Sequence, residues 1–291
     1  MMVRTTGLSK SYGPHVALSD VDIEVPRGSV YGLVGPNGAG KTTLLMILAG
    51  LRHPTGGQVR LEAPPRRVAL LPDTPQFDPW LTGFEVVSLA AHLSEARSPD
   101  VGRMLADAGL SDAAQRRVGG YSRGMLQRLG IAATMVGQPE LLLLDEPASA
   151  LDPAGRREVL DLIAGLRGEA TVVFSSHILG DVHEVCDTVG VMRAGTLLYQ
   201  GTLENLLVGR AVPAYRVHLR SPAGPVVEAL RRQEWVTAVA EPLPRRLHIK
   251  VRSLADAERQ LAALLGESGA LVVSLTPDAA DLEDVFLELT S

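Results

Sequence analysis

Short runs of apolar residues recur through the first two thirds of the chain and alternate with stretches whose apolar residues follow helical spacing. Val30–Val34, Leu141–Leu144 and Thr171–Ser176 are the clearest runs, and they are typical of parallel strands that are buried on both faces. Helical spacing is evident over Thr43–Ala49 and over residues 154–166. Strands that alternate with helices predict an α/β fold built around a parallel sheet.

The N-terminal part of the chain, residues 1–34, is predicted to be rich in β-structure. Val21–Val25 alternates apolar and polar residues with period two, which indicates a half-buried strand. Leu8–Gly13 precedes this strand and is expected to be a loop that carries Tyr12.

Two short strands are predicted after the first helix, at Gln58–Glu62 and Val68–Leu71. Residues 72–79 are expected to form a loop, because their prolines fit neither a helix interior nor a central strand. Residues 82–118 show Ala and Leu at helical spacing. With the helix expected directly after it, this stretch predicts a helical insertion over about residues 82–135.

The chain after residue 176 is predicted to complete the first domain with a helix through Cys186, two strands and a short helix. The last three elements are expected at Val189–Met192, Thr196–Gln200 and Thr202–Leu207. The segment 210–213 then marks a boundary, so the sequence predicts one domain over 1–209 and another over 210–291.

Residues 210–291 predict a small α+β domain, of about the smallest size that folds alone. No catalytic constellation is recognisable in it, and we expect it to pack on the first domain or on a second copy. Its expected elements are strand Tyr215–Leu219, helix Val226–Arg232, strands Val236–Ala240 and Leu247–Val251, helix Leu254–Leu265, strand Leu271–Leu275 and helix Leu282–Leu289.

Composition narrows the class of protein. The chain has 291 residues, of which 46% are hydrophobic, as in soluble globular proteins. A net charge of -5 gives no general attraction to nucleic acid. The single cysteine, Cys186, excludes an intrachain disulfide, fits a reducing compartment and is expected to be a small core residue. With no signal sequence and no apolar run of roughly 18–20 residues, the chain is expected to be soluble by itself.

One glycine-rich turn lies between the first buried strand and the helix that begins near Thr43. It matches the phosphate-binding loop G-x-x-x-x-G-K-[ST] in the required context of strand and helix. Its glycines let successive N–H groups point at one spot, and the helix adds its positive dipole end. We expect Lys41 to reach the β- and γ-phosphates and Thr42 to bind Mg²⁺. The residues are Gly35, Pro36, Asn37, Gly38, Ala39, Gly40, Lys41 and Thr42.

Two carboxylates, Asp145 and Glu146, follow the strand Leu141–Leu144, at the strand end where ligands bind in open α/β sheets. We expect Asp145 to hold Mg²⁺, directly or through water, and Glu146 to accept a proton from the attacking water. His177 ends another buried strand, where it can bond the γ-phosphate or orient the water.

A second phosphate site is predicted at the helix that begins near residue 123. Ser122 has the residue type of a helix N-cap, and a helix N-terminus that carries Ser122 and Gly124 suits a phosphate. One ATP needs only one phosphate cradle, so a chain with two needs a reason for the second. Asp152 is likewise predicted to cap a helix, with Pro153 at its first position.

These motifs together resemble the ATP-binding subunit of an ABC transporter over about residues 3–208, because they occur in that family's order. Residues 210–291 are similar to the C-terminal extension of ABC-2-type exporter ATPases of the daunorubicin-resistance kind. The resemblance implies a P-loop NTPase fold, ATP and Mg²⁺ as cofactors, and hydrolysis of ATP. The matching segments are Gly35–Thr42 (Walker A), 121–125 (the ABC signature), Leu141–Glu146 (Walker B), 149–152 (the D-loop) and His177 (the switch histidine).

The resemblance also explains the second phosphate site. In the family, two nucleotide domains pair head to tail, which implies that Ser122 and Gly124 contact the γ-phosphate held by the other chain. Such a pairing is self-complementary, so a homodimer suffices. The implied partner is a membrane permease on a separate chain, at the cytoplasmic face of the membrane, and no nucleic acid is expected. Tyr12 is expected to stack on the adenine, and Thr43 to lie beside the phosphates.

Two segments depart from the family pattern. The usual glutamine after the third strand is Asp73 here, and Gln76 lies three residues on. Either Asp73 takes that role at Mg²⁺ and the attacking water, or Gln76 does. The signature has Tyr121, Arg123 and Met125 where Leu, Gly and Gln are commonest, and Arg123 is placed to add a charge-assisted contact to the nucleotide.

Two other functions are alternatives to a transporter subunit. A soluble ABC ATPase that acts on nucleic acid or the ribosome is disfavoured, since the chain has no long heptad insertion, no second nucleotide domain and no basic tail. A third possibility is an ATP-gated switch without hydrolysis. For a transporter, the permease contact is expected at the loop 73–80 and the insertion 82–118, where Phe77, Trp80 and Phe84 either are exposed or form a local core. Drug, lipid and polysaccharide export are all compatible with the sequence.

Overall fold

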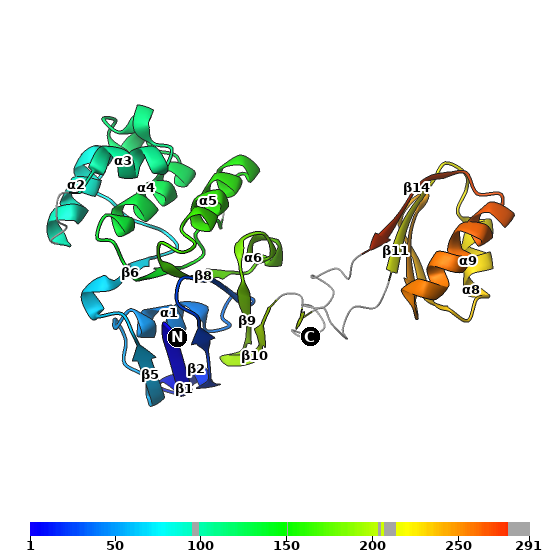
Figure 1. Ribbon diagram of the computed structural model, residues 1–291, viewed down its shortest axis with the longest axis horizontal. Helices are drawn as coiled ribbons and strands as arrows, with labels where there is room; N and C mark the ends of the chain where they lie inside the picture. Colours follow the sequence, from blue (N-terminus) through cyan, green and yellow to red (C-terminus); the bar gives the residue numbers. More distant parts are fainter. Residues whose placement is uncertain (95–98, 150, 203–204, 207–213, 279–291) are drawn as a thin grey trace. The chain divides into compact units, whose positions relative to one another are not determined.

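The computed structural model of the chain divides into two compact units, one up to residue 202 and the other from residue 205 onward (Figure 1). The predicted domain boundary at 209–210, the predicted helix Leu282–Leu289, Ala150 of the D-loop and most of the predicted helix Thr202–Leu207 lie outside the described residues. The structure describes residues 1–94, 99–149, 151–202, 205–206 and 214–278.

A central sheet organises the first unit. Within the described residues its strand order is β10-β9-β4-β8-β7-β6, and all of these run parallel except β10. Every residue of β4 (Val30–Val34), β7 (Leu141–Leu144) and β8 (Thr171–Ser176) is buried, as the apolar runs predicted. The predicted α/β fold class is therefore confirmed. The remaining strands are β6 (Val68–Leu71), β9 (Thr188–Arg193) and β10 (Thr196–Gly201).

An antiparallel sheet forms the second layer of this unit. Its longest strand, β1, pairs with each of the other three. The strands are β1 (Val3–Tyr12), β2 (His15–Val21), β3 (Glu24–Val25) and β5 (Gly56–Leu61).

Two predictions for this N-terminal part are wrong. Val21–Val25 is not one strand, because β2 ends at Val21 and β3 begins at Glu24. Thr5 Oγ1 donates to the Val21 carbonyl at 2.8 Å and accepts from the Ile23 N–H at 2.9 Å, so a side chain replaces ladder hydrogen bonds at this corner. Tyr12 is the last residue of β1 and does not lie on a loop.

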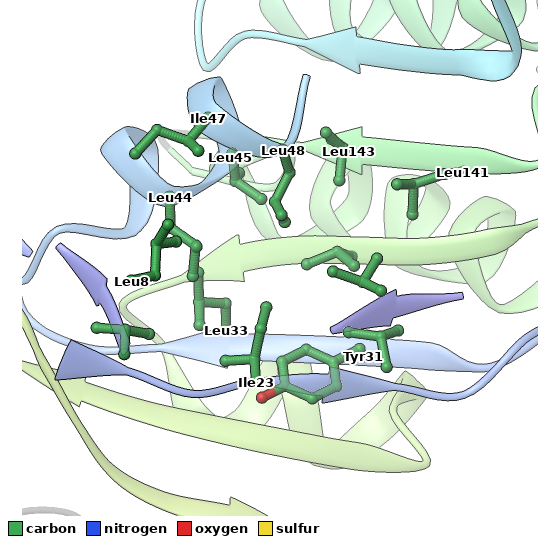
Figure 2. Packing of buried hydrophobic residues seen from close by; sticks show 14 of the residues in the cluster. Leu8, Ile23, Tyr31, Leu33, Leu44, Leu45, Ile47, Leu48, Leu141 and Leu143 are labelled. Atoms are coloured by element: carbon green, nitrogen blue, oxygen red, sulfur yellow. The ribbon is translucent and has the colours of Figure 1, made fainter. Parts of the chain in front are cut away.

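Helix α1 (Lys41–Leu48) packs its apolar side chains against both sheets (Figure 2). Leu44, Leu45 and Leu48 of α1 belong to one buried cluster with side chains from the antiparallel sheet and from β4 and β7. This packing fixes the start of α1 at the carboxyl end of β4. Other members of the cluster are Leu8, Ile23, Tyr31, Leu33, Leu141 and Leu143.

The predicted helical insertion contains α2 (Gly83–Leu93), α3 (Val101–Asp107) and α4 (Arg123–Met135) around a core of its own. Phe77 packs against that core and is half-buried. Trp80 and Phe84 are 72% and 40% exposed. Of the three aromatic residues proposed for a partner contact, Phe77 is thus a core residue and two lie at the surface. Short 3₁₀ segments occur at Pro65–Arg67, Ser111–Ala113 and Val118–Gly120.

Two more helices, α5 (Pro153–Gly165) and α6 (Leu179–Val185), belong to the first unit. The predicted N-cap of α5 is confirmed, since the Asp152 side chain accepts from the Gly155 N–H. The helix predicted through Cys186 ends one residue earlier, because Cys186 is extended. Its thiol packs against β4, where a Cβ built on Gly32 would lie 2.7 Å from the sulfur.

The second unit has strands and helices in the order β11-α8-β12-β13-α9-β14, and its described strands form one antiparallel sheet in the order β12-β13-β11-β14. Helices α8 and α9 cover one face of this sheet (Figure 1), with Leu230 and Leu261 buried in its core. The predicted elements are confirmed with small shifts: β11 (Ala214–Leu219), α8 (Gly224–Arg231), β12 (Val236–Leu243), β13 (Arg246–Val251), α9 (Leu254–Glu267) and β14 (Val272–Asp278).

Candidate nucleotide-binding site

The loop from Gly35 to Gly40 joins β4 to α1, and two of its glycines leave no room for a side chain. A Cβ on Gly35 would lie 2.3 Å from the carbonyl oxygen of Met192, and one on Gly40 would lie 2.6 Å from that of Ala17. Gly40 also has φ of 103°, which side chains of L-residues disfavour. Close packing against β2 and β9 therefore sets the path of the loop and leaves the N-terminus of α1 facing the pocket beside it.

Lys41 begins α1 and is only 5% exposed. Its Nζ donates to the carbonyl oxygens of Gly35 at 2.6 Å and Pro36 at 3.3 Å, and lies 3.0 Å from Glu146 Oε1. A buried ammonium group needs such partners, because desolvation without them is costly. The arrangement holds one positive charge directly beside the phosphate loop.

Ser175 of β8 bonds to both residues that follow β7, to the carboxylate of one and the backbone of the other. Its Oγ donates to Asp145 Oδ1 at 2.6 Å and accepts from the Glu146 N–H at 2.8 Å. Asp145 is 6% exposed and Ser175 is fully buried. Ser175 was not among the predicted site residues; the signal available was a pair of polar residues at the end of an otherwise apolar strand.

Glu146 links the phosphate loop to His177. Its backbone φ is +46°, a left-handed conformation that is uncommon for a residue other than glycine. Its Oε1 faces Lys41, and its Oε2 lies 2.7 Å from His177 Nδ1. The structure thus brings together three residues that the sequence placed on three separate segments.

Asp73 lies on the same pocket and is tied to two further segments. Ser149 Oγ donates to Asp73 Oδ1 at 2.8 Å, and the Gln127 side chain of α4 donates to the Asp73 carbonyl oxygen. Gln76, the other candidate for the glutamine role, is exposed and does not line the pocket.

These residues surround an open pocket of 310 Å³. Gly35 and Pro36 do not line it. Their carbonyl oxygens instead accept hydrogen bonds from Lys41, which does line it. His177 does not line the pocket either, but it contacts the lining residue Glu146. His15 and Ala17 of β2 line the pocket and were missed, since they belong to no motif. The lining is His15, Ala17, Asn37, Gly38, Ala39, Gly40, Lys41, Thr42, Thr43, Asp73, Asp145 and Glu146.

Tyr12 lies at the edge of this region without lining the pocket. It is 42% exposed, pairs with His15 across the β1–β2 ladder, and has Lys10 Nζ 4.9 Å from its ring centroid. The aromatic face is therefore available near the pocket mouth but is already covered on one side by a cation.

Ser122 and Gly124 do not line this pocket either. Ser122 is the N-cap of α4, as predicted, and its Oγ accepts from the Met125 N–H at 3.3 Å. Gly124 lies beside α5, where a Cβ would be 3.8 Å from Gly155 Cα. Ser122 and Arg123 are exposed, so this helix N-terminus is open to another molecule.

The oxygen donors of the pocket fit a magnesium ion. Thr42 supplies a hydroxyl, and Asp145 and Asp73 supply carboxylates, which are the ligand types that Mg²⁺ prefers. One Asp145 oxygen is engaged by Ser175, which orients the carboxylate. Mg²⁺ also keeps waters and phosphate oxygens among its ligands, so two or three protein donors suffice.

A buried ion pair lies behind His177. Asp181 of α6 is 2% exposed, and it accepts hydrogen bonds from Arg156 of α5 and from Ser176 of β8. Burial raises the pKa of Asp181 above its ordinary value, and the Arg156 guanidinium opposes that rise. The pair joins α5 and α6 to the end of the strand that carries His177.

The helices in the described part of the chain are all too short or too polar to cross a membrane. Residues 18–149 match the family model described as ABC transporter. The chain is 36% identical to an uncharacterised ABC transporter ATP-binding protein, YxlF, of Bacillus subtilis, over 99% of both chains. It is 33% identical to the daunorubicin/doxorubicin resistance ATP-binding protein DrrA of Streptomyces peucetius, over 99% of this chain and 92% of that one.

A similar match joins the chain to the bacitracin transport ATP-binding protein BcrA of Enterococcus faecalis, at 32% identity over 99% of this chain and 96% of that one. Among solved structures, an ATP-binding subunit of an ABC transporter superposes with a TM-score of 0.64 at 27% identity, covering 71% of this chain and 92% of that one. These matches favour transport over action on nucleic acid or the ribosome. The chain belongs to the ABC transporter family, as an ATP-binding and ATP-hydrolysing subunit.

Proposed function

We propose that two copies of this chain close head to tail around two ATP molecules and drive a permease carried on a separate chain. Each ATP lies between Lys41 of one copy and Ser122 and Gly124 of the other. The observation that carries the proposal is that Ser122 and Gly124 stand at an open helix N-terminus yet do not line the pocket of their own chain. A two-fold pairing supplies each pocket with the phosphate site that it lacks.

Within each pocket the residues divide the work. Lys41 and the loop N–H groups bind the β- and γ-phosphates, with Thr43 beside them, and Tyr12 stacks on the base. Thr42 and Asp145 hold Mg²⁺, which when bound neutralises charge on the phosphate oxygens. When Lys41 engages phosphate it leaves Glu146 Oε1, which then accepts the proton of the attacking water. His177 keeps hold of Oε2 and so orients the carboxylate.

Asp73 takes the role of the missing glutamine. Two observations support this choice over Gln76: Asp73 lines the pocket, and its carboxylate accepts a hydrogen bond from Ser149. From there it reaches both Mg²⁺ and the attacking water. Through Gln127 it is also attached to α4, so nucleotide in one pocket acts on the helix that serves the other.

The permease contact is proposed on α2 and the loop before it, with the chain on the inner face of the cell membrane. Trp80, Phe84, Leu89 and Leu93 are exposed there, with Leu93 at 74%. Several large apolar side chains on one small helical region are typical of a protein interface. Because relatives that match over the whole chain are named for bacitracin transport and daunorubicin resistance, we infer that this chain serves an exporter.

The pairing is tested by mixing two inactive variants. Lys41→Met disables the phosphate loop, and Gly124→Glu places a negative charge where the other chain's phosphate would approach. Each pure variant has two broken sites, whereas a mixed pair has one intact site and one doubly broken site. We expect each variant alone to be inactive and the mixture to recover about a quarter of the wild-type ATPase rate, since half of the pairs are mixed.

A second readout uses a different affinity tag on each variant. ATP should bring both tags into one complex, which is detected by pulling down one tag and probing for the other. A mixture that stays inactive and forms no doubly tagged complex with ATP would show that each chain completes its own site. A control mixture of Gly124→Glu with Glu234→Gln, an exposed acid of the second unit, should give about half of the wild-type rate, because half of its sites keep both intact halves.

A further inference from the structure

A second cavity, larger than the nucleotide pocket, lies between α3, α4 and α5 of the first unit, which run beside one another in Figure 1. Its volume is 650 Å³. The floor is apolar and is formed by Met104, Ile131, Met135, Leu162 and Leu166. None of the residues assigned to ATP binding or hydrolysis lines this cavity, which we call the groove. A cavity of this size that is lined partly by apolar side chains is typical of sites for small organic ligands.

The rim of the groove carries more negative than positive charge. Four carboxylates face two guanidinium groups there, a net charge of -2. Both cations are already paired with rim acids: Arg103 lies 3.6 Å from Asp107, and Arg128 lies 3.2 Å from Glu158. Of the two remaining acids, Asp161 pairs at the surface with Arg157, whose Nε lies 3.4 Å away, and Glu169 is exposed without an ion pair among the described residues. A ligand with a positive group would meet Glu169 and would compete with Arg157 for Asp161, since exposed ion pairs are weak.

Arg128 is held too firmly to serve an anionic ligand. One of its terminal nitrogens donates to the carbonyl oxygens of Ala108 and Gly109, both at 3.0 Å, while the other pairs with Glu158. Its Nε is buried and finds no acceptor among the described residues, so it does not face the groove as a free donor.

We propose that this groove binds an amphiphile with an apolar body and a cationic ammonium head. The body lies on the floor of methionine, leucine and isoleucine side chains. The head lies beside the rim acids Asp161 and Glu169.

Binding in this groove acts on ATP hydrolysis through the two helices that form its walls. α4 begins at Ser122 and α5 at Asp152, and the helices touch near their first turns, where Gly124 meets Gly155. One turn further on, Arg128 of α4 pairs with Glu158 of α5, and beyond this ion pair the groove opens between the two helices. A ligand wedged there changes the angle between the helices and moves Ser122 relative to the D-loop. This consequence rests on the proposed role of Ser122, whereas the binding itself does not.

Methionine methyl groups report on the site directly. In the full chain labelled with ¹³C at the methionine methyls, decanoylcholine should shift the resonances of Met104 and Met135 in a saturable way. Met2 and Met192, buried in the sheet core, serve as internal references and should not move. Decanoate has the same acyl chain with the opposite charge and should bind about tenfold more weakly. Absent shifts at Met104 and Met135, or equal binding of the two probes, would overturn the proposal.

Variants separate the site from its effect. Asp161→Asn combined with Glu169→Gln should weaken decanoylcholine about fivefold. The matched pair Glu228→Gln and Glu234→Gln, both exposed in the second unit, should leave binding unchanged. Saturating decanoylcholine should change the ATPase rate of the wild-type chain. If the rate were unchanged when the methionine methyl resonances have shifted completely, the proposed coupling between the groove and ATP hydrolysis would be overturned. Because the methyl shifts need no hydrolysis, a failure here is distinguishable from a failure of the head-to-tail pairing.

Discussion

Replacing Ser175 by alanine tests how the two carboxylates of the nucleotide pocket are held. Ser175 is fully buried at the end of β8, where its hydroxyl donates to Asp145 and accepts from the Glu146 N–H. Alanine fits the same space, so no cavity of consequence is made. The change leaves a carboxylate oxygen and an N–H group buried without a partner.

The cost follows from these two bonds. A hydrogen bond to a charged group contributes about 1.5–3 kcal/mol, and a neutral one about 1 kcal/mol. We therefore expect Ser175→Ala to lower the free energy of unfolding by about 3 kcal/mol. Turnover should fall by about 10–100-fold, because residues that orient metal ligands and catalytic carboxylates have effects of that size.

Urea denaturation followed by circular dichroism measures the stability, and ATPase assays across a Mg²⁺ titration measure the activity. Ser29→Ala is the matched control, since it removes a single hydrogen bond, to the Pro26 carbonyl, at a half-buried position. It should cost about 1 kcal/mol or less and leave turnover intact. If Ser175→Ala cost no more than Ser29→Ala, Asp145 and Glu146 would have to be held by other groups.

Two further predictions concern the same region. Arg156→Gln leaves Asp181 buried without its cation and should lower the free energy of unfolding by about 3–5 kcal/mol at neutral pH. Burial already raises the pKa of Asp181 above 3.8, so the contribution of this group to the free energy of unfolding falls as pH rises through the raised pKa. The stability lost in the variant should therefore shrink toward about pH 4. A loss that does not vary with pH in urea denaturation would contradict this prediction. Glu146→Gln should keep ATP binding but almost abolish turnover, so that ATP-bound pairs persist in size-exclusion chromatography, while Glu234→Gln behaves as wild type. Near-normal turnover in Glu146→Gln would remove that residue as the base.

The sequence predicted the central strands well because their burial on both faces leaves a continuous apolar run. β7 and β8 were predicted with the bounds that the structure has. The loop from Gly35 to Thr42 was equally readable, since tight packing and phosphate chemistry both restrict its residues. In each case one local requirement dominates the choice of residue.

Residues that act across elements were harder to find. Ser175 reaches Asp145 and Glu146 only because β8 lies beside β7, and neighbouring strands are set by the sheet order and not by the local pattern. His15 enters the pocket from the other sheet, through packing that no spacing rule records. The split of Val21–Val25 has the same origin, because the Thr5 hydroxyl that interrupts the strand comes from β1.

Helix α4 has the contacts needed to transmit a change from one nucleotide pocket to the other. Gln127 attaches it to Asp73 of its own pocket, and in the proposed pairing Ser122 at its start faces the pocket of the second copy. Near its middle, α4 packs closely on β6, because a Cβ on Gly130 would lie 2.5 Å from Leu71 Cδ1. We therefore expect a displacement of Asp73 toward phosphate to turn α4 about this close contact and not to shift it along its axis. Such a rotation would move Ser122 at one end and the groove wall at Met135 at the other, so that nucleotide and the proposed amphiphile would act on the same motion.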